Sequence, residues 1–340
     1  MEKQKNLRLS RRLLALCGMV TPGHRLCDVG CDHALVPLYL LEQGLIPSAL
    51  AMDVAEGPLR AAAANLAAHG EVARGLTDGK PATGEELKPC LSDEKSAASG
   101  ESVSRPPRVE LRLSDGLDDY RPGEAQTLLI AGMGGLVIRS ILTREPDKTR
   151  SFRELILEPQ SEAALVRAAL RELGAGICDE VMVEEDGKFY PIIRAVPGTA
   201  GVRPDWDAAQ TGTVRSAVKS DIGDALARPA AQFGSGEMLT RSAAKSGNEA
   251  EADAAARRRL EDAYGPALLQ KRDGTLRRFL EWRRQVNETV RQSLTEAVRA
   301  DSAGENQAAA QTRRLARLRE LQAERADLEA VLALFAKREK

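Results

Sequence analysis

Between residues 25 and 196, short apolar runs alternate with stretches whose apolar residues recur at helical spacing. The runs are too short for helices and are bounded by glycine, acidic residues or turns, which indicates buried strands. We expect strands at 25–29, 49–54, 109–113, 127–130, 154–157, 177–184 and 189–196. Helices are expected at 9–19, 34–42, 56–69, 136–142 and 161–173, the last capped by Ser161 and ended by Gly174.

The order of these elements predicts the fold class. Strands that alternate with helices form a mainly parallel sheet that is covered on both faces. The last two strands are separated by Glu185-Asp186-Gly187-Lys188, and Asp-Gly is a strong signal for a hairpin turn. The sequence therefore predicts an α/β protein with a seven-stranded, doubly wound sheet and an antiparallel edge.

Two segments carry the features of a binding site. Cys27-Asp28-Val29-Gly30-Cys31-Asp32-His33 spans the end of the first strand, and Ile130-Ala131-Gly132-Met133-Gly134-Gly135 spans the end of the fourth. Each places acidic groups or bare backbone at the carboxyl end of a strand. Open α/β sheets bind their ligands at that edge.

The first segment has the geometry that nucleotide-like cofactors use, because a glycine lets the ligand approach the backbone and a helix N-terminus supplies N–H donors. It contains only Gly30, however, and is not Gly-x-Gly-x-x-Gly, in which a second glycine makes room for a pyrophosphate. A cofactor without phosphates but with a charged amino-acid end suits Asp28 and Asp32 better.

Acidic residues also end the next two strands. Asp53 is placed to accept hydrogen bonds from ribose hydroxyls, and Asp115-Gly116 is placed to meet the exocyclic amine of an adenine. Taken alone, each acid is more simply a solvated residue at a strand end. Three acids at successive strand ends favour a common ligand.

Outside this pattern the chain changes character. The stretches 71–107 and 199–256 are rich in small and charged residues and lack a periodic apolar face, so we expect flexible insertions or linkers. From 257 to 340 the apolar pattern is purely helical, with a turn at 301–307, which predicts an antiparallel coiled-coil hairpin. An ordinary helical pair or a dimerisation arm is the alternative. The expected domains are thus 1–198, a linker at 199–256, and 257–340.

The apolar stripes of the two tail helices define the seam that we expect between them. The first stripe comprises Leu276, Phe279, Arg283, Val286, Val290 and Ala297. The second comprises Leu318, Leu321, Arg325, Leu328, Leu332 and Phe335. Basic residues outnumber acidic ones in the tail and the reverse holds elsewhere, which favours a polyanionic partner over a bare helical surface.

The remaining composition narrows the class of protein. The five cysteines are scattered, with no Cys-x-x-Cys pair, so we expect no metal site and a reducing compartment. No apolar window is long enough to span a bilayer, and the N-terminus lacks a signal-peptide pattern. A cytoplasmic protein is expected, monomeric unless the coiled coil forms a dimer.

Five motifs together resemble one known family. They are Leu9-Ser10-Arg11-Arg12-Leu13, Asp28-Val29-Gly30-Cys31-Asp32-His33-Ala34, Ser114-Asp115-Gly116-Leu117, Ile130-Ala131-Gly132-Met133-Gly134-Gly135 and Glu184-Glu185-Asp186-Gly187-Lys188-Phe189-Tyr190. In order and context they resemble the bacterial TrmK-like family, S-adenosylmethionine-dependent methyltransferases that act on N1 of adenosine 22 in tRNA. The likeness covers about 7–197 and resumes near Tyr264-Gly265-Pro266.

The resemblance implies a Rossmann-like class I methyltransferase domain followed by a coiled-coil domain. It also implies a cofactor-binding set for S-adenosylmethionine, which comprises Asp28, Gly30, Cys31, Asp32, Asp53, Asp115, Gly116, Ala131, Gly132, Met133, Gly134 and Gly135. The chain departs from the family where Cys31 replaces an expected Ser and where Glu158-Pro159-Gln160 replaces Gln-Pro-Asn. Both insertions also look longer than the family needs.

Catalysis and RNA binding are assigned to separate residue sets. Asp32, His33 and Gln160 are the candidates for positioning or charge stabilisation near the target base, with cofactor contact or packing as the alternative. The candidate tRNA footprint comprises Arg8, Arg11, Arg12, Arg277, Arg278, Arg284, Arg291, Arg313, Arg314 and Arg317. Two other functions remain open: methylation of another RNA position, a protein or a small molecule, and a non-catalytic cofactor-binding protein.

Overall fold

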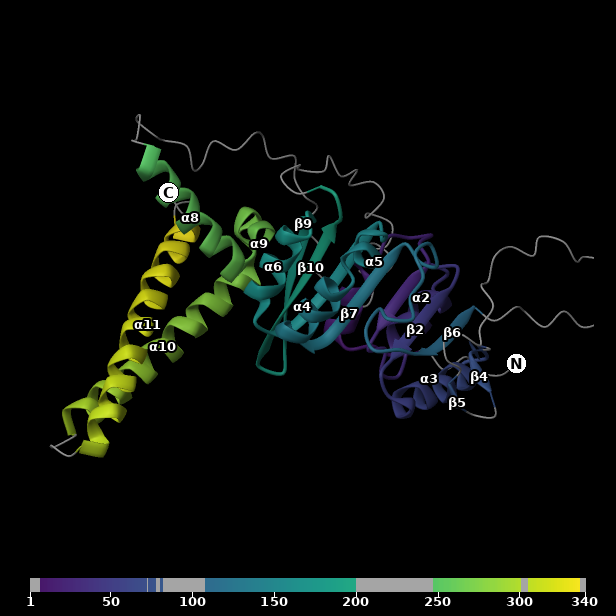
Figure 1. Ribbon diagram of the computed structural model, residues 1–340, viewed down its shortest axis with the longest axis horizontal. Coiled ribbons are helices and arrows are strands. Elements are labelled where there is room, and N and C mark those ends of the chain that lie inside the picture. The colour runs from purple at the N-terminus through teal and green to yellow at the C-terminus, as the bar shows by residue number, and fades with distance from the viewer. Residues whose placement is uncertain are drawn as a thin grey trace, which may run out of the picture. The chain divides into compact units, whose positions relative to one another are not determined.

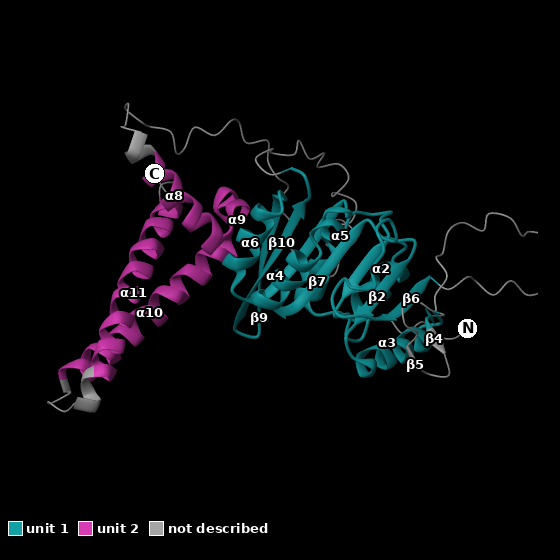
Figure 2. Cartoon of the chain, viewed as in Figure 1, with its two compact units in different colours: residues 1–240 teal, residues 241–340 magenta. Residues whose placement is uncertain are grey.

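The computed structural model describes residues 7–71, 73–77, 80–81, 108–199, 247–300 and 305–336. The chain divides into two compact units, 1–240 and 241–340 (Figure 2). We describe each unit by itself.

Unit 1 is built on a mixed eight-stranded sheet with the order β3-β6-β2-β1-β7-β8-β10-β9 (Figure 1). Its strands are β1 (Leu26–Val29), β2 (Ala49–Asp53), β3 (Ala73–Arg74), β6 (Val109–Leu113), β7 (Thr127–Gly134), β8 (Glu154–Ser161), β9 (Gly176–Glu185) and β10 (Lys188–Val196). The strands from β3 to β8 are parallel, and β10 pairs antiparallel with both β8 and β9. All seven predicted strands are present, and the hairpin is confirmed.

The eighth strand was not predicted. β3 lies at the start of 71–107, where we expected no structure, and pairs with β6 at the sheet edge. Two further short strands, β4 (Leu76–Thr77) and β5 (Lys80–Pro81), pair only with each other. These strands have two residues each, which is too short to show a period in the sequence. Residues 82–107 lie outside the described part of the chain.

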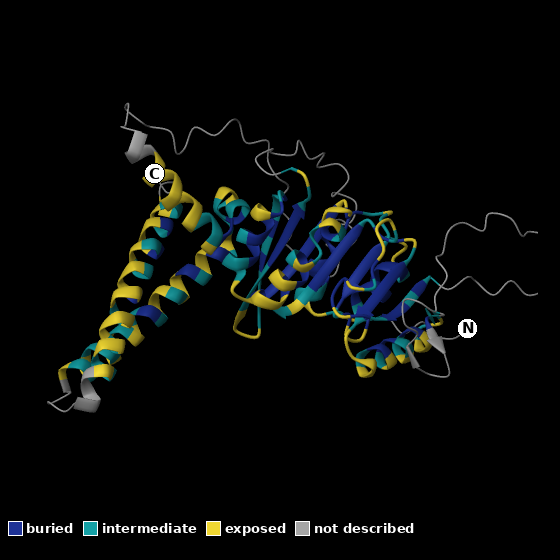
Figure 3. Cartoon of the chain, in the orientation of Figure 1, coloured by how far each residue is buried: buried dark blue, intermediate teal, exposed yellow. Residues whose placement is uncertain are grey.

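Helices cover both faces of the sheet. Helices α1 (Arg11–Cys17), α2 (Leu35–Glu42) and α3 (Glu56–Ala68) pack in one apolar cluster with sheet residues that include Leu26 and Leu129. Helices α4 (Gly135–Arg144) and α6 (Ala163–Glu172) pack in a second cluster against the alternate strand residues, such as Cys27 and Leu128. This two-sided burial, shown by the dark strands in Figure 3, explains why the strands read as continuous apolar runs.

The start of one helix differs from the prediction, and one short helix was not predicted. Ser161 does not cap α6: it ends β8, and Glu162 occupies the cap position with a φ of 46°. A short helix, α5 (Pro146–Arg150), follows α4 and begins with the proline that the sequence places at its first turn.

Unit 2 consists of helices α8 (Gly247–Tyr264), α9 (Pro266–Lys271), α10 (Gly274–Ala300) and α11 (Glu305–Ala336). α8 begins within the stretch that we expected to be a linker, because its alanine-rich sequence favours a helix although it has no apolar stripe. α10 and α11 lie side by side and run in opposite directions (Figure 1), and ion pairs such as Arg283–Glu324 and Glu288–Arg325 join them. A coiled coil between them stays a prediction.

The seam on α10 matches the predicted stripe only in part, at Leu276. Leu276, Leu280 and Asn287 are its buried residues, whereas Val290 is exposed. On α11 the seam includes the predicted Leu321 and Leu328. Both stripes on α10 have helical spacing, so spacing alone did not select the stripe that packs against α11.

In the described ranges no helix is long and apolar enough to cross a membrane. The same ranges hold no group of three or more His, Cys, Asp or Glu side chains arranged to bind a metal ion.

Candidate active site

The fold brings the two predicted segments together. β1 lies between β2 and β7, so the ends of all three strands meet at one edge of the sheet. A Cβ added to Gly30 would lie 2.1 Å from Cε of Met133, which means that the Met133 side chain occupies the space a side chain at Gly30 would need. Gly30 also has a φ of 74°, which favours glycine. The φ value is what favours glycine at this turn, and the flexible end of the Met133 side chain fills the space beside it.

Asp28 is the most perturbed acid of the site. It lies in β1, is 6% exposed, and shares the sheet face of α1 and α2. Burial, and then the negative charges of Asp53 and Asp32, raise the pKa of Asp28 to about 7. A buried acid with no positive charge offsetting it is a natural binding partner for a cation.

The turn after β1 is strained and open. Asp32 and Ala34 have left-handed φ values of 44° and 51°, which non-glycine residues adopt rarely and at a cost of about 1 kcal/mol or more. The side chains of Asp32 and His33 are 76% and 51% exposed and lie 3.5 Å apart. Cys31, by contrast, is buried, and burial and the charge of Asp28 raise the pKa of its thiol.

Asp53 and its neighbour end β2. One carboxylate oxygen of Asp53 accepts a hydrogen bond from the backbone N–H of Ala55 at 2.9 Å, which fixes the side chain at the strand end. Val54, the next residue, is 68% exposed. The sequence prediction missed Val54, although an apolar residue directly after a strand-end acid was visible.

Asp115 is not a free acceptor. Its carboxylate receives a hydrogen bond from Arg144 of α4 at 3.0 Å, and Arg144 also pairs with Asp118. A Cβ added to Gly116 would lie 3.1 Å from the side chains of Arg144 and Ile141. The glycine thus allows α4 to pack closely, and Arg144 is a neighbour of the site that the sequence did not reveal.

The strand that was expected at 127–130 runs further, through the glycine-rich segment as far as Gly134. β7 continues through Gly134 because β8 extends in parallel to Ser161 and pairs with it, with irregular register on both sides of Met133. A Cβ on Gly135 would lie 2.5 Å from the backbone oxygen of Glu162, so this glycine allows α4 to approach the segment before α6. A Cβ on Gly132 would lie 3.8 Å from the amide nitrogen of Gln160, which places Gln160 beside the segment.

Two apolar residues are exposed where α4 begins. Leu136 and Val137 are 59% and 51% exposed and directly follow the glycine-rich segment. The helix buries Ile138, Ile141 and Leu142 on its other side. An apolar surface therefore adjoins the carboxyl end of β7.

The candidate RNA-binding arginines are in different environments. Arg8 and Arg11 are exposed, whereas Arg12 is held by Glu158. In unit 2, Arg277, Arg291 and Arg317 pair with acids of their own helices, as a solvated helical surface would. Arg284 and Arg313 are exposed, Arg314 is half-buried, and Arg278 is exposed and donates to the hydroxyl of Thr275.

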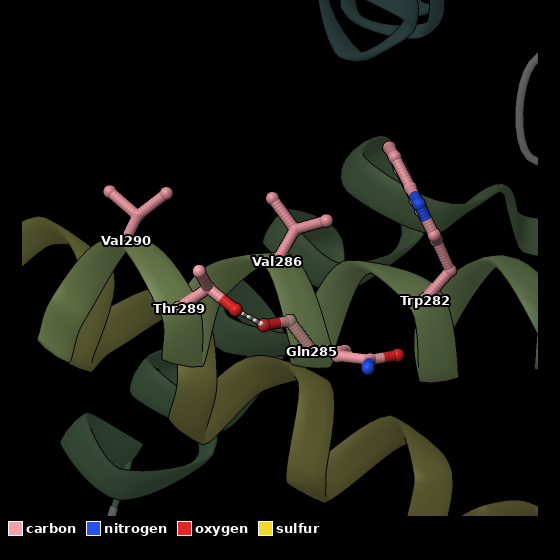
Figure 4. Close-up of a pocket in the computed structure, with 5 residues that line it drawn as sticks. All are labelled: Trp282, Gln285, Val286, Thr289 and Val290. Atoms are coloured by element: carbon pink, nitrogen blue, oxygen red, sulfur yellow. Dashed lines mark hydrogen bonds between the residues drawn. The ribbon is translucent and has the colours of Figure 1, made fainter. Parts of the chain in front are cut away.

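α10 also carries a shallow hollow of about 300 Å³ on the side away from its seam. Trp282, Val286 and Val290 line it and point to the same side, with Gln285 and Thr289 beside them (Figure 4). Trp282 is 44% exposed. The hollow thus offers an exposed aromatic surface.

The fold and the site define the class of protein. A doubly wound sheet with acids ending β1, β2 and β6 and glycines ending β7 is the arrangement of a Rossmann-like methyltransferase domain. The family model described as "Methyltransferase domain" matches residues 9–79 and 88–193.

Comparison with known proteins identifies the family. The chain is 32% identical over 211 residues to the tRNA (adenine(22)-N(1))-methyltransferase of Bacillus subtilis strain 168, which covers 62% of this chain and 72% of that protein. The chain belongs to this methyltransferase family, which confirms the resemblance.

Solved structures show the same fold. A protein of the NADB-Rossmann superfamily from Streptococcus agalactiae is 21% identical, with a TM-score of 0.59 over 96% of this chain and 99% of its own. TrmK from B. subtilis is 21% identical, with a TM-score of 0.58 over 96% of this chain and 100% of its own. TrmK from M. capricolum, solved with S-adenosylhomocysteine, is 16% identical, with a TM-score of 0.55 over 96% and 98% of the two chains.

Proposed function

We propose that this protein transfers a methyl group from S-adenosylmethionine to N1 of adenosine 22 in tRNA. The observation that carries the proposal is the 32% identity to a methyltransferase of that activity, which spans 72% of the relative. The convergence of the acids and glycines at one sheet edge supports it. We further propose that the protein acts as a monomer in the cytoplasm.

The chemistry of the site fits the cofactor. S-adenosylmethionine, when bound, supplies a methyl group on a positively charged sulfur. Asp28 and Asp32 would bind its charged amino-acid end, where the turn at Gly30 leaves the backbone open. Asp53 would accept from the ribose hydroxyls, and the exposed side chain of Val54 would pack against the adenine. Asp115 would reach the adenine edge only if it shares or releases Arg144.

The other proposed cofactor contacts are backbone. Gly116 and the segment from Ala131 to Gly135, with Met133 at its centre, would form the floor between cofactor and target base. Cys31 would contribute packing and not a nucleophile, because burial raises the pKa of its thiol.

Methyl transfer to N1 needs alignment more than base catalysis, because the ring nitrogen already carries a lone pair. The product is cationic, so a carboxylate near the base stabilises it. Asp32 is exposed and can serve, and His33 and Gln160 would position the base. The exposed Leu136 and Val137 would pack against a base that has been flipped out of the tRNA.

RNA binding would rely on phosphate contacts and shape. The exposed arginines at 8, 11, 284 and 313 are the best-placed members of the proposed footprint. The hollow at Trp282 would add stacking, worth about 1–3 kcal/mol for each base in contact.

The proposal is tested with labelled S-adenosylmethionine and bulk tRNA from a strain that lacks this modification. Nucleoside analysis should find labelled 1-methyladenosine. Label in another nucleoside, in protein or in small molecules would show a different methyl acceptor. Cofactor binding without transfer to any of these acceptors would show a non-catalytic binding protein.

A further inference from the structure

Arg12 is held by three elements of the sheet. Its guanidinium donates a 2.6 Å hydrogen bond to Oε2 of Glu158 in β8. Its backbone N–H donates to the carboxylate of Glu185 in β9 at 3.2 Å, and its guanidinium carbon lies 5.2 Å from the ring centre of Tyr190 in β10. The neighbouring Arg11 is exposed. These contacts orient Arg12 toward the protein rather than toward a polyanion in solvent.

Glu158 links Arg12 to the glycine-rich segment. The same Oε2 atom accepts a 2.9 Å hydrogen bond from the backbone N–H of Gly132, which has a φ of 79°. The residue after Gly132 is Met133, whose side chain contacts Gly30. A continuous set of contacts thus runs from Arg12 through Glu158 and Gly132 to the turn after β1.

The burial of Glu158 is costly, which indicates a specific requirement. Its side chain is 0% exposed, and its Oε1 atom has no hydrogen-bond partner among the described residues. Burial raises the pKa of this carboxyl, and the charge of Arg12 and the N–H of Gly132 oppose the rise. Because the carboxylate is covered by protein, it acts through Gly132 and not by touching the substrate.

We propose that Arg12 and Glu158 are positioning residues for methyl transfer, which hold the backbone at Gly132, and that Arg12 does not bind RNA phosphate. The proposal rests on the methyltransferase function proposed above. It reassigns Arg12 from the RNA footprint predicted from the sequence to the support of the active site.

The test compares Arg12→Gln with Arg171→Gln, the same change at an exposed arginine in the last turn of α6, and with Arg11→Gln as a probe of phosphate contact. For Arg12→Gln we expect kcat at saturating cofactor and tRNA to fall by up to about a hundredfold, because small misplacements of reacting groups have effects of this size. The salt dependence of tRNA affinity should stay as in the wild type. Arg171→Gln should keep both kcat and the salt slope of the wild type, whereas Arg11→Gln should lower the salt slope by about one where Arg11 contacts a phosphate.

Glu158 variants extend the test. Glu158→Ala should lower kcat as Arg12→Gln does, and the double variant should be no worse than either single variant, since both act through the same contacts. Arg12→Lys and Glu158→Gln should recover much of kcat, because a lysine amine can still donate to Glu158 and a glutamine amide oxygen can still accept from the N–H of Gly132. Thermal unfolding of each variant distinguishes loss of the fold from displacement of the backbone at Gly132. If Arg12→Gln or Glu158→Ala unfolds the protein, Arg12→Lys and Glu158→Gln still test the proposal.

Three results would overturn the proposal: a lower salt slope with unchanged kcat for Arg12→Gln, additive losses in the double variant, or full activity of Glu158→Ala. Failure of the proposed function itself looks different, because the wild-type protein would then methylate no tRNA. In that case the affinity of the variants for S-adenosylhomocysteine would still show whether Arg12 and Glu158 hold the backbone at Gly132 in place.

Discussion

At the scale of single residues, the chemistry of the site depends most on Asp28. Its place at the end of the first strand could be predicted from the sequence, as could those of Asp53 and Gly30. The raised pKa of Asp28 could not be predicted from the sequence, because it results from burial and from the nearby charges of Asp53 and Asp32, which depend on the folded structure.

Cofactor affinity should depend on pH through Asp28. A charged amino-acid end is bound by the ionised carboxylate, so binding lowers the pKa of Asp28 from about 7. Affinity is then full above this pKa and should fall as pH drops through it, by up to about tenfold per unit. Titration calorimetry with S-adenosylhomocysteine between about pH 5.5 and about 8.5 measures the slope.

Asp28→Asn is the control for this prediction. The variant should bind weakly and with little pH dependence, because the amide does not ionise. An unchanged slope in the variant would assign the pH dependence to another group.

The residues that the sequence did not reveal share one cause. Glu158 and Arg144 act through partners that are distant in sequence, Arg12 and Asp115. No local pattern marks such pairs. Arg12 illustrates the consequence, since in the sequence it is indistinguishable from Arg11.

At the scale of elements, a buried ion pair joins β8 to β10. Glu154 accepts hydrogen bonds from Arg194, Thr21 and Thr127, and both members of the pair are 2% exposed. Burial alone would raise the pKa of Glu154, but the hydrogen bond from His24 and the charge of Arg194 lower it to about 2.

Glu154→Gln should destabilise unit 1 by about 3 kcal/mol at neutral pH, because it leaves Arg194 buried without a counter-charge. A lowered folded-state pKa means that the ionised pair stabilises the fold above the unfolded value of about 4.5 and that this is lost as pH falls toward about 2. Urea unfolding should therefore show a gap between wild type and variant that closes from about pH 5 to about pH 2. A gap that is constant with pH would contradict this account.

The helical pair of unit 2 contains a polar residue at its seam. The side-chain amide of Asn287 donates to the backbone oxygen of Leu321 at 3.0 Å and to Glu324 at 3.1 Å, while its Oδ1 atom is buried without a partner among the described residues. Such a residue fixes register at a cost in stability.

Asn287→Leu should raise the free energy of unfolding of unit 2 by about 1 kcal/mol. It should also allow the helices to pair in other registers or with a second copy of the chain, so that self-association increases. Urea midpoints and light scattering measure the two effects, with the exposed Val290→Leu as the control. A less stable variant would mean that the amide contributes more than the buried oxygen costs.

Two features of the elements could not be predicted from the apolar pattern of the sequence. The seven main strands follow from alternating apolar runs. The length of β7 does not, because its glycines carry no strand signal and become a strand only through pairing with β8. The stripe predicted for α10 was right at Leu276 and wrong at Val290 for a related reason: two stripes had the same spacing, and only packing against α11 distinguishes them.

At the scale of the whole molecule, the chain contains a methyltransferase unit and a helical unit that carries exposed arginines. Family membership is shown by a relative that shares 32% identity. The domains expected at 1–198 and 257–340, with a linker between them, stay a prediction. That unit 2 binds tRNA stays a proposal. Sequence patterns do not indicate which parts of tRNA binding belong to unit 1 and which to unit 2.

The central claim is tested most directly with one tRNA transcript and a matched transcript in which adenosine 22 is replaced by guanosine. After incubation with the protein and S-adenosylmethionine, primer extension should stop at position 22 of the first transcript, since a methyl group on N1 blocks base pairing. The second should show no stop and take up no methyl group. Equal methylation of both transcripts, or a stop at another position, would contradict the account.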